Sequence, residues 1–295
     1  MLGRAQWTAA AAAHGARVDA LTAGHRRRRT EGRAHPVEDF LFVYYPFTVS
    51  ALRRWHPGPG VRLAGAAHDE RANWRFTRVI GADTELDLAA YRQARAARVR
   101  QVLALLEATA ARPVQLGCFG LHEWAMVYRL APGDVRHTGW PLRLGSAGTD
   151  AVVEANSLRC SHFDAFRFFT EPARPRNTEQ LTRARQLELE QPGCLHAGMD
   201  LYKWAMRLAP GLPSELVADC FEHARALREL DMRASPYDLR ELGYEPIPVE
   251  TPAGKAVYAA EQRRFAALGQ ALRTRLIAAC ASLLGLDRAD GAKGA

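Results

Sequence analysis

Apolar residues recur at helical spacing over most of the chain. Between residues 89 and 111, Val99, Val102 and Leu106 lie on one face of a helix, and Pro113 ends it. The same criteria predict further helices over residues 6–29, 117–130, 178–190, 194–208, 214–233 and 252–284. The aromatic segment 36–55 is interrupted by Pro46 and predicts two short helices. The pattern therefore predicts a mainly α fold.

Three other segments do not follow this helical pattern. Residues 74–80 and 85–88 alternate around the turn Gly81–Thr84, which predicts a small β-hairpin. Residues 134–149 have little periodicity and predict an ordered irregular segment, whereas 158–169 fits a strand or a helix, with the strand favoured. The sequence as a whole predicts one domain, a multi-helix bundle over residues 1–295, with an N-terminal helix and basic arm (1–35) and a frayed tail (287–295).

Two segments of the chain resemble each other. The motif L-x-x-W-A-M followed by R-L-A-P-G occurs over 121–133 and, two residues shorter, over 201–211. One interpretation is an internal helical duplication, which would place His122 and Glu123 opposite Tyr202 and Lys203 on facing helices. The other is that both segments are buried helices ended by Pro-Gly in an alanine-rich protein.

Composition and charge narrow the class of protein. The 295 residues are 48% hydrophobic and 24% charged, which excludes a fibrous or disordered chain. The net charge of +8 favours a polyanionic partner such as DNA. All but three of the 40 basic residues are arginine, a bias that is also typical of a GC-rich coding sequence, so the charge is a weak indication.

Cysteine content and hydropathy indicate the compartment. Five dispersed cysteines do not form a disulfide scaffold and fit a reducing cytoplasm. The N-terminal segment lacks the order of a signal peptide, and no apolar run approaches the roughly 18 residues of a membrane span. We therefore expect a cytoplasmic protein without a membrane partner, and the sequence leaves its oligomeric state open.

Four cysteines are each followed closely by a histidine, with an acid nearby. The resulting donors could hold a divalent metal (iron, manganese or zinc) as in helical non-haem iron sites, and they are His122, Glu123, His162, His196, Asp200, Asp219 and His223. No Cys-x-x-Cys pair supports structural zinc. In a metal-free interpretation, a carboxylate oriented by histidine acts as a general base. In a third, cysteine and histidine fill core positions of a non-catalytic binding protein.

Two further features bear on chemistry. Lys203 is one of three lysines in an arginine-rich chain, and lysine, unlike arginine, can lose its proton and act as a nucleophile or base. A set of aromatic residues could form the walls of a pocket that stacks a flat base, or could simply be core; they are Trp124, Tyr128, Phe166, Tyr202 and Trp204.

Longer motifs link the chain to a known family. They are PVEDFLF (36–42), RWHPG (54–58), LGCFGLHEWAM (116–126), LRCSHFDAFRFF (158–169) and QPGCLHAGMDLYKW (191–204). In these segments the chain resembles a family of actinobacterial proteins named 3-methyladenine DNA glycosylase, and the resemblance covers nearly its whole length. It implies hydrolysis of the bond between an alkylated purine and deoxyribose in base-excision repair, with no cofactor.

That reaction requires a basic surface, an aromatic pocket and a carboxylate that supports the sugar cation or activates water. The candidate carboxylates are Asp164, Glu123 and Asp200, and the histidines that would orient them are His162, His196 and His122. Residues Arg26, Arg27, Arg28 and Arg29 would contact DNA phosphates. The alternative function is a helical metal-dependent oxidoreductase, and metal content separates the two hypotheses.

Overall fold

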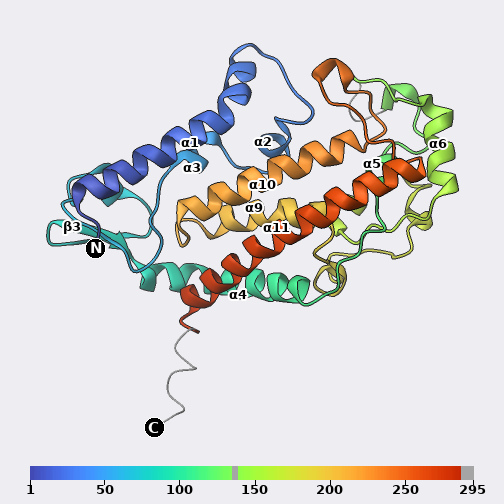
Figure 1. Cartoon of the computed structure of the whole chain (residues 1–295). Helices are drawn as coiled ribbons and strands as arrows, with labels where there is room; N and C mark the ends of the chain where they lie inside the picture. The colour runs from blue at the N-terminus through green and yellow to red at the C-terminus, as the bar shows by residue number, and fades with distance from the viewer. Residues whose placement is uncertain (135–138, 287–295) are drawn as a thin grey trace, which may run out of the picture.

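The computed structural model describes residues 1–134 and 139–286, and within them the chain is mainly helical (Figure 1). Four long helices dominate, and they are α1 (Arg4–Thr30), α4 (Leu88–Ala110), α10 (Ser214–Arg233) and α11 (Pro252–Leu284). The 14-residue α9 (Leu195–Leu208) lies among them. The shorter helices are α2 (Phe40–Tyr44), α3 (Val49–Arg53), α5 (Leu121–Ala125), α6 (Gly145–Ala155), α7 (Phe163–Phe166) and α8 (Gln186–Leu189). These elements confirm the mainly α prediction.

Helix α9 is the centre of the packing. It packs against both α10 and α11. Helix α11 in turn packs along α4 (Figure 1). Small residues permit this close approach, because a Cβ atom on Gly198 would lie 2.6 Å from the side chain of Leu227. One apolar cluster joins these helices and includes residues from Val18 to Leu283. Polar side chains of α9 are therefore held inside the protein.

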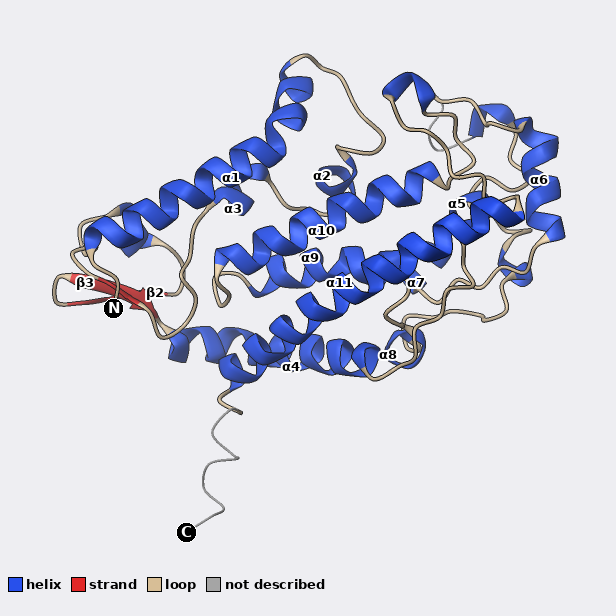
Figure 2. Cartoon of the chain, viewed as in Figure 1, coloured by secondary structure: helices blue, strands red, loops and turns tan. Residues whose placement is uncertain are grey.

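A small antiparallel sheet lies at one end of the molecule, beside the start of α1 (Figure 2). Strands β2 (Thr77–Ile80) and β3 (Asp83–Leu86) form the predicted hairpin, with Val79 opposite Thr84. A third strand, β1 (Arg62–Leu63), pairs with β3. Its two residues are too few to give a periodic pattern, so the sequence did not indicate it.

Five predicted helices and the pair of short helices are confirmed within one or two residues at most ends. The two remaining predicted helices, over 117–130 and 178–190, are much shorter in the structure, where only α5 and α8 form. Left-handed backbone at Phe119 and Gly120 delays the start of α5, and the same conformation at Arg129 prevents a continuous helix. Side-chain hydrogen bonds compete with helix in the second segment, where Asn177 donates to the backbone of Glu179.

The strand predicted over 158–169 is wrong. Leu158 forms only an isolated bridge with Asn177, and the segment continues into the short helix α7. His162 caps that helix, because its Nδ1 accepts a hydrogen bond from the backbone of Ala165 at 3.3 Å. The irregular segment over 134–149 is also partly wrong, since α6 begins at Gly145. Residues 135–138 and the predicted frayed tail lie outside the described residues.

The two similar sequence segments have different structures. They share helix only over their first five residues, as α5 in the first segment and as 201–205 of α9 in the second, and only the second continues as helix, to Leu208. Trp124 is fully buried and donates to the carbonyl of Ala234, a contact that fixes α5 against α10. In the part of the chain that the structure describes, no helix combines the length and apolar character of a membrane span.

Candidate functional site

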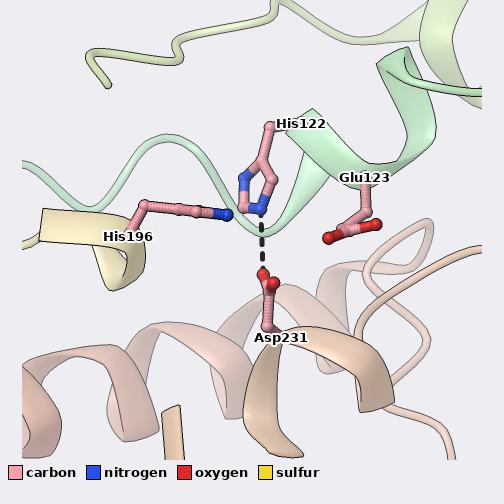
Figure 3. A group of neighbouring side chains, drawn as sticks. All are labelled: His122, Glu123, His196 and Asp231. Atoms are coloured by element: carbon pink, nitrogen blue, oxygen red, sulfur yellow. Dashed lines mark hydrogen bonds and ion pairs between the residues drawn. The ribbon is translucent and has the colours of Figure 1, made fainter. Parts of the chain in front are cut away.

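Four buried side chains from three helices converge inside the protein (Figure 3). His122 and Glu123 come from α5, His196 from the first turn of α9 and Asp231 from the end of α10. One ligand atom of each lies within 4.8 Å of those of the others. We call these four residues the central cluster.

Local backbone geometry brings α5 to this position. Gly120 precedes the helix with φ of 74°, and a Cβ there would lie 3.1 Å from the Cβ of Ala234 and 3.4 Å from the ring of Tyr258. Only glycine has both the conformation and the absent side chain that this approach requires. As a result, the second and third residues of α5, His122 and Glu123, face the end of α10.

An arginine lies within the central cluster. Arg228 donates to Glu123 Oε1 at 2.9 Å and to Asp231 Oδ2 at 3.1 Å, and its side chain is 2% exposed. The other oxygen of Asp231 is hydrogen-bonded to His122 Nε2 at 2.9 Å. Each carboxylate thus has a cationic or hydrogen-bonding partner, which buried charges require.

Protonation differs between the two histidines of the cluster. Burial opposes the charged form of His122, but the Asp231 carboxylate and the Cys118 sulfur raise its pKa well above the ordinary value. Burial and the neighbouring cations His122, His162 and Arg228 lower the pKa of His196 well below it. His196 is therefore neutral near pH 7, and its buried Nδ1 has no hydrogen-bond partner among the described residues.

A second group of buried polar residues lies beside the cluster. His162 Nε2 is 3.1 Å from Asp200 Oδ2 and 3.7 Å from a carboxylate oxygen of Glu190. Asp200 also accepts from the hydroxyl of Tyr45 at 2.7 Å and pairs with Lys203. The imidazole of His196 joins the two groups, with its ring centre 4.6 Å from that of His122 and 5.5 Å from that of His162.

Lys203 is held as an ammonium ion. Its Nζ lies 3.3 Å from Asp164 and contacts Asp200, and the side chain is 8% exposed. Burial opposes the charge, but Asp200 and Asp164 together raise the pKa of Lys203 above its ordinary value. The same contacts lower the pKa of Asp200, again against its burial. The geometry therefore favours an ion-pair role for Lys203 over that of a nucleophile.

A surface pocket of about 600 Å³ reaches this second group. Asp164 and Lys203 line it together with Tyr44, Trp204 and Arg183. A much smaller cavity, of about 10 Å³, reaches Glu123 and His196 and shares Tyr44 and Asp164 with the larger pocket. The central cluster is thus nearly closed, whereas the Lys203–Asp164 pair is accessible to a ligand.

Two predicted metal ligands lie elsewhere. Asp219 pairs with Arg17 and Arg275 on the outer side of α10. His223 lies against the ring of Phe265, and its Nε2 has no hydrogen-bond partner in the described structure. Asp231, on the same helix, is eight residues further on, about 12 Å along the axis. The one-turn spacing of Asp219 and His223 therefore reflects the local geometry of α10 and not a shared site.

Most of the predicted aromatic wall belongs to the core. Trp124, Phe166 and Tyr202 are buried in the main apolar cluster. Tyr128 is also buried there, and its hydroxyl donates to Glu154 at 2.8 Å. Of the five aromatic residues, only Trp204 lines the large pocket.

The predicted phosphate-binding arginines are not equivalent. Arg28 is largely buried in ion pairs with Glu38 and Asp39, so it stabilises the turn that follows α1. Arg26 pairs with Asp19 at 2.7 Å. Arg26 and Arg29 both line a surface depression of about 380 Å³, and Arg27 is exposed. These three remain available to a polyanion, and Arg28 is not.

Sequence reasoning missed Asp231, Arg228, Glu190 and Tyr45. Asp231, Arg228 and Tyr45 lie outside the cysteine–histidine segments that were used to find donors. Glu190 lies four residues before Cys194, but Asp200 was taken as the acid of that pair. One signal was present, since Arg228 and Asp231 are charged residues at core positions of an otherwise apolar helical face. Comparisons of the chain with protein-family models, with curated proteins and with solved structures found no match.

Proposed function

We propose that the protein is a metal-dependent enzyme of the oxidoreductase type and that the central cluster holds a divalent metal ion. The observation that carries the proposal is the convergence of His122, Glu123, His196 and Asp231 within 4.8 Å inside the protein. Imidazole and carboxylate ligands from facing helices suit iron, manganese and zinc. Bound iron would supply electron-transfer chemistry with dioxygen.

The charges of the cluster are compatible with such an ion. Arg228 supplies one positive charge to the carboxylates of Glu123 and Asp231, and burial raises the pKa of Asp231. Without a metal, the raised pKa of His122 supplies a proton as the second compensating charge. Because a ligating imidazole must be neutral, a metal would compete with that proton. His196 is already neutral and needs no deprotonation.

The access path favours small reagents at this centre. The cavity that reaches Glu123 and His196 measures about 10 Å³, which is about the space of one water-sized molecule. A hydrolase must place a bulky carbonyl or phosphoryl group on its metal, and this cavity does not hold one. A water-sized molecule fits, which supports redox chemistry with a small reagent over a metallohydrolase.

The test is elemental analysis of protein purified without chelators or affinity metals, followed by titration of the stripped protein with Fe(II), Mn(II) and Zn(II). We expect about one equivalent of one of these metals. Asp231→Asn and His196→Gln should each reduce the metal content at least tenfold, because loss of one of four ligands removes both charge and geometry. Affinity should rise with pH as His122 loses its proton.

The matched control is His223→Gln. His223 is a buried histidine of α10 that does not belong to the central cluster. This variant should keep the full metal content. Circular dichroism and thermal melting establish that all three variants fold. The proposal is wrong if the stripped wild-type protein binds none of the three ions, or if the control loses as much metal as the cluster variants.

A second candidate is DNA glycosylase activity on alkylated purines, the function that the family resemblance implies. Two observations favour it: the Asp164 carboxylate lies in the same pocket as Trp204, and Arg26, Arg29 and Arg53 line a separate surface depression. The test is release of free 3-methyladenine from methylated DNA in the presence of a chelator. Release that Asp164→Asn abolishes would support this activity, and no release from the wild type would exclude it.

A further inference from the structure

The 600 Å³ pocket beside Lys203 is formed by four helices and the end of α2. Tyr44 and Tyr45 contribute from the α2 end, and α4 supplies the apolar side chains of Val102 and Leu105. Segments around α7, α8 and α9 add the charged residues. Its volume lies within the range of about 300–1,000 Å³ that small-molecule sites occupy. A ligand of one or two rings fits this volume.

Positive charge dominates the lining. Four cations face the pocket, namely Arg167, Arg183, Lys203 and Arg207, against the one carboxylate of Asp164, so the lining carries a net charge of 4 − 1 = +3. Asp164 pairs with Arg183, Lys203 and, at 3.7 Å, Arg167. Within the described residues, Arg207 forms no ion pair and is exposed. Arg207 is therefore the cation most available to an anionic ligand.

The indole of Trp204 forms the aromatic wall. Lys203 Nζ lies 4.4 Å from its ring centre and the Arg207 guanidinium 5.3 Å from it. The Trp204 side chain is only half-buried, although most of α9 is inside the protein. An aromatic face beside a guanidinium can stack a planar ring while the guanidinium binds the anion of the same molecule.

We propose that this pocket binds a planar aromatic or heteroaromatic acid, with its ring on Trp204 and its carboxylate or phosphate on Arg207. The ring would then point toward Lys203 and Asp164. The pocket shares Asp164 and Tyr44 with the small cavity at the central cluster, so a bound ring lies on the same side of the proposed metal centre as that cavity. That this acid is the substrate rests on the proposed function, whereas its binding does not.

The test is isothermal titration calorimetry of the full-length protein with matched probes. The anionic ring probes are 2-naphthoate and AMP, the neutral ones are 2-naphthamide and adenosine, and acetate and inorganic phosphate are the anions without a ring. We expect at least one anionic ring probe to bind at least tenfold more tightly than both its neutral counterpart and its ringless anion. The better of 2-naphthoate and AMP identifies the anion as carboxylate or phosphate.

Two variants distinguish the contribution of the ring to binding from that of the anion. Arg207→Gln should lower the affinity for the anionic ring probe about tenfold, because one charge-assisted contact is lost. The affinity for the neutral counterpart should not change. Trp204→Leu should weaken the charged and neutral ring probes equally. The control Arg263→Gln removes an exposed arginine of α11 that does not line the pocket. It should bind like the wild type.

The inference is wrong if neither anionic ring probe binds more tightly than its counterparts, or if Arg207→Gln has no more effect than Arg263→Gln. Titrations are run on both the purified and the metal-stripped protein. Probe binding by a protein that neither contains nor takes up any of the three metals would refute the metal proposal and leave the pocket assignment intact. Metal binding with no probe binding would refute the pocket assignment and leave the metal proposal intact.

Discussion

Replacement of Lys203 by methionine tests whether the ion pairs at the pocket floor hold the buried carboxylates in place. The change keeps an unbranched side chain, shorter by one heavy atom, and removes its charge. At the observed 3.3 Å between Lys203 Nζ and Asp164 Oδ2, the attraction is about 5 kcal/mol at an effective dielectric constant of about 20. Asp200, which is 1% exposed, loses its ammonium partner as well.

The expected loss of stability is smaller than the sum of these attractions. Asp200 keeps its hydrogen bonds to Tyr45 and His162, so its charge remains partly compensated. Removal of one partner of a buried pair costs about 3–5 kcal/mol, and we expect the lower end of this range. The double variant Lys203→Met with Asp200→Asn removes the charge left behind and should be about 2 kcal/mol more stable than the single variant.

The pH dependence of the free energy of unfolding gives a second test of this reasoning. In the wild type, Lys203 and His162 lower the pKa of Asp200, so its contribution to stability is present above the ordinary carboxylate pKa and is lost as pH falls below it. Without Lys203 the pKa of Asp200 rises toward its ordinary value or above. The variant can then take up the proton on folding, and its deficit relative to the wild type should shrink between pH 7 and pH 4.

Urea denaturation followed by circular dichroism measures the free energy of unfolding at each pH. The control is Lys255→Met, because Lys255 is less buried and its Nζ contacts the side-chain oxygen of Asn156 and no carboxylate. We expect the control to lose less than about 1 kcal/mol. The reasoning is refuted if Lys203→Met loses no more than Lys255→Met, or if its deficit is the same at pH 4 as at pH 7.

Three further outcomes follow from the packing. Gly254→Ala should cost at least about 2 kcal/mol, because its Cβ would lie 2.0 Å from the Pro248 carbonyl oxygen. Gly133→Ala, whose Cβ would meet none of the described residues within 4 Å, should cost little in the same denaturation experiment. Burial lowers the pKa of His223 to about 4, so the wild type should lose stability as pH falls from 6.5 to 4, and His223→Gln should lose less. Burial raises the pKa of Cys280 to about 12, so iodoacetamide at pH 8 should label it only after unfolding, as mass spectrometry can show.

The candidate site was only partly predictable from the sequence. His122, Glu123 and His196 were recognised because cysteine, histidine and acid recur together in the chain. Asp231 was missed, and Asp219 was chosen in its place on the same helix. Spacing alone shows which residues share a face of α10, but which of its turns meets α5 depends on a left-handed glycine 111 residues earlier, Gly120.

The sequence by itself determined the long elements. Apolar periodicity over three or more turns, together with side-chain caps such as Asp87 before α4 and Thr251 before α11, specifies a helix through interactions within a few residues. The β2–β3 hairpin is similarly local. Short segments such as 158–169 do not have enough periodic positions to choose between strand and helix, so their contacts with distant residues decide the outcome.

The tertiary structure alone decided which charges meet. Arg228, Asp231 and Glu123 are at ordinary charged positions in the sequence, and only the docking of α5 on α10 converts them into one buried network. The protonation states follow from the same docking, because burial and neighbouring charge set the pKa of His122 and His196 in opposite directions. Helices form through interactions between residues that are close in the sequence. The electrostatic interactions depend on distances between residues that are far apart in the sequence, and only the folded structure sets these distances.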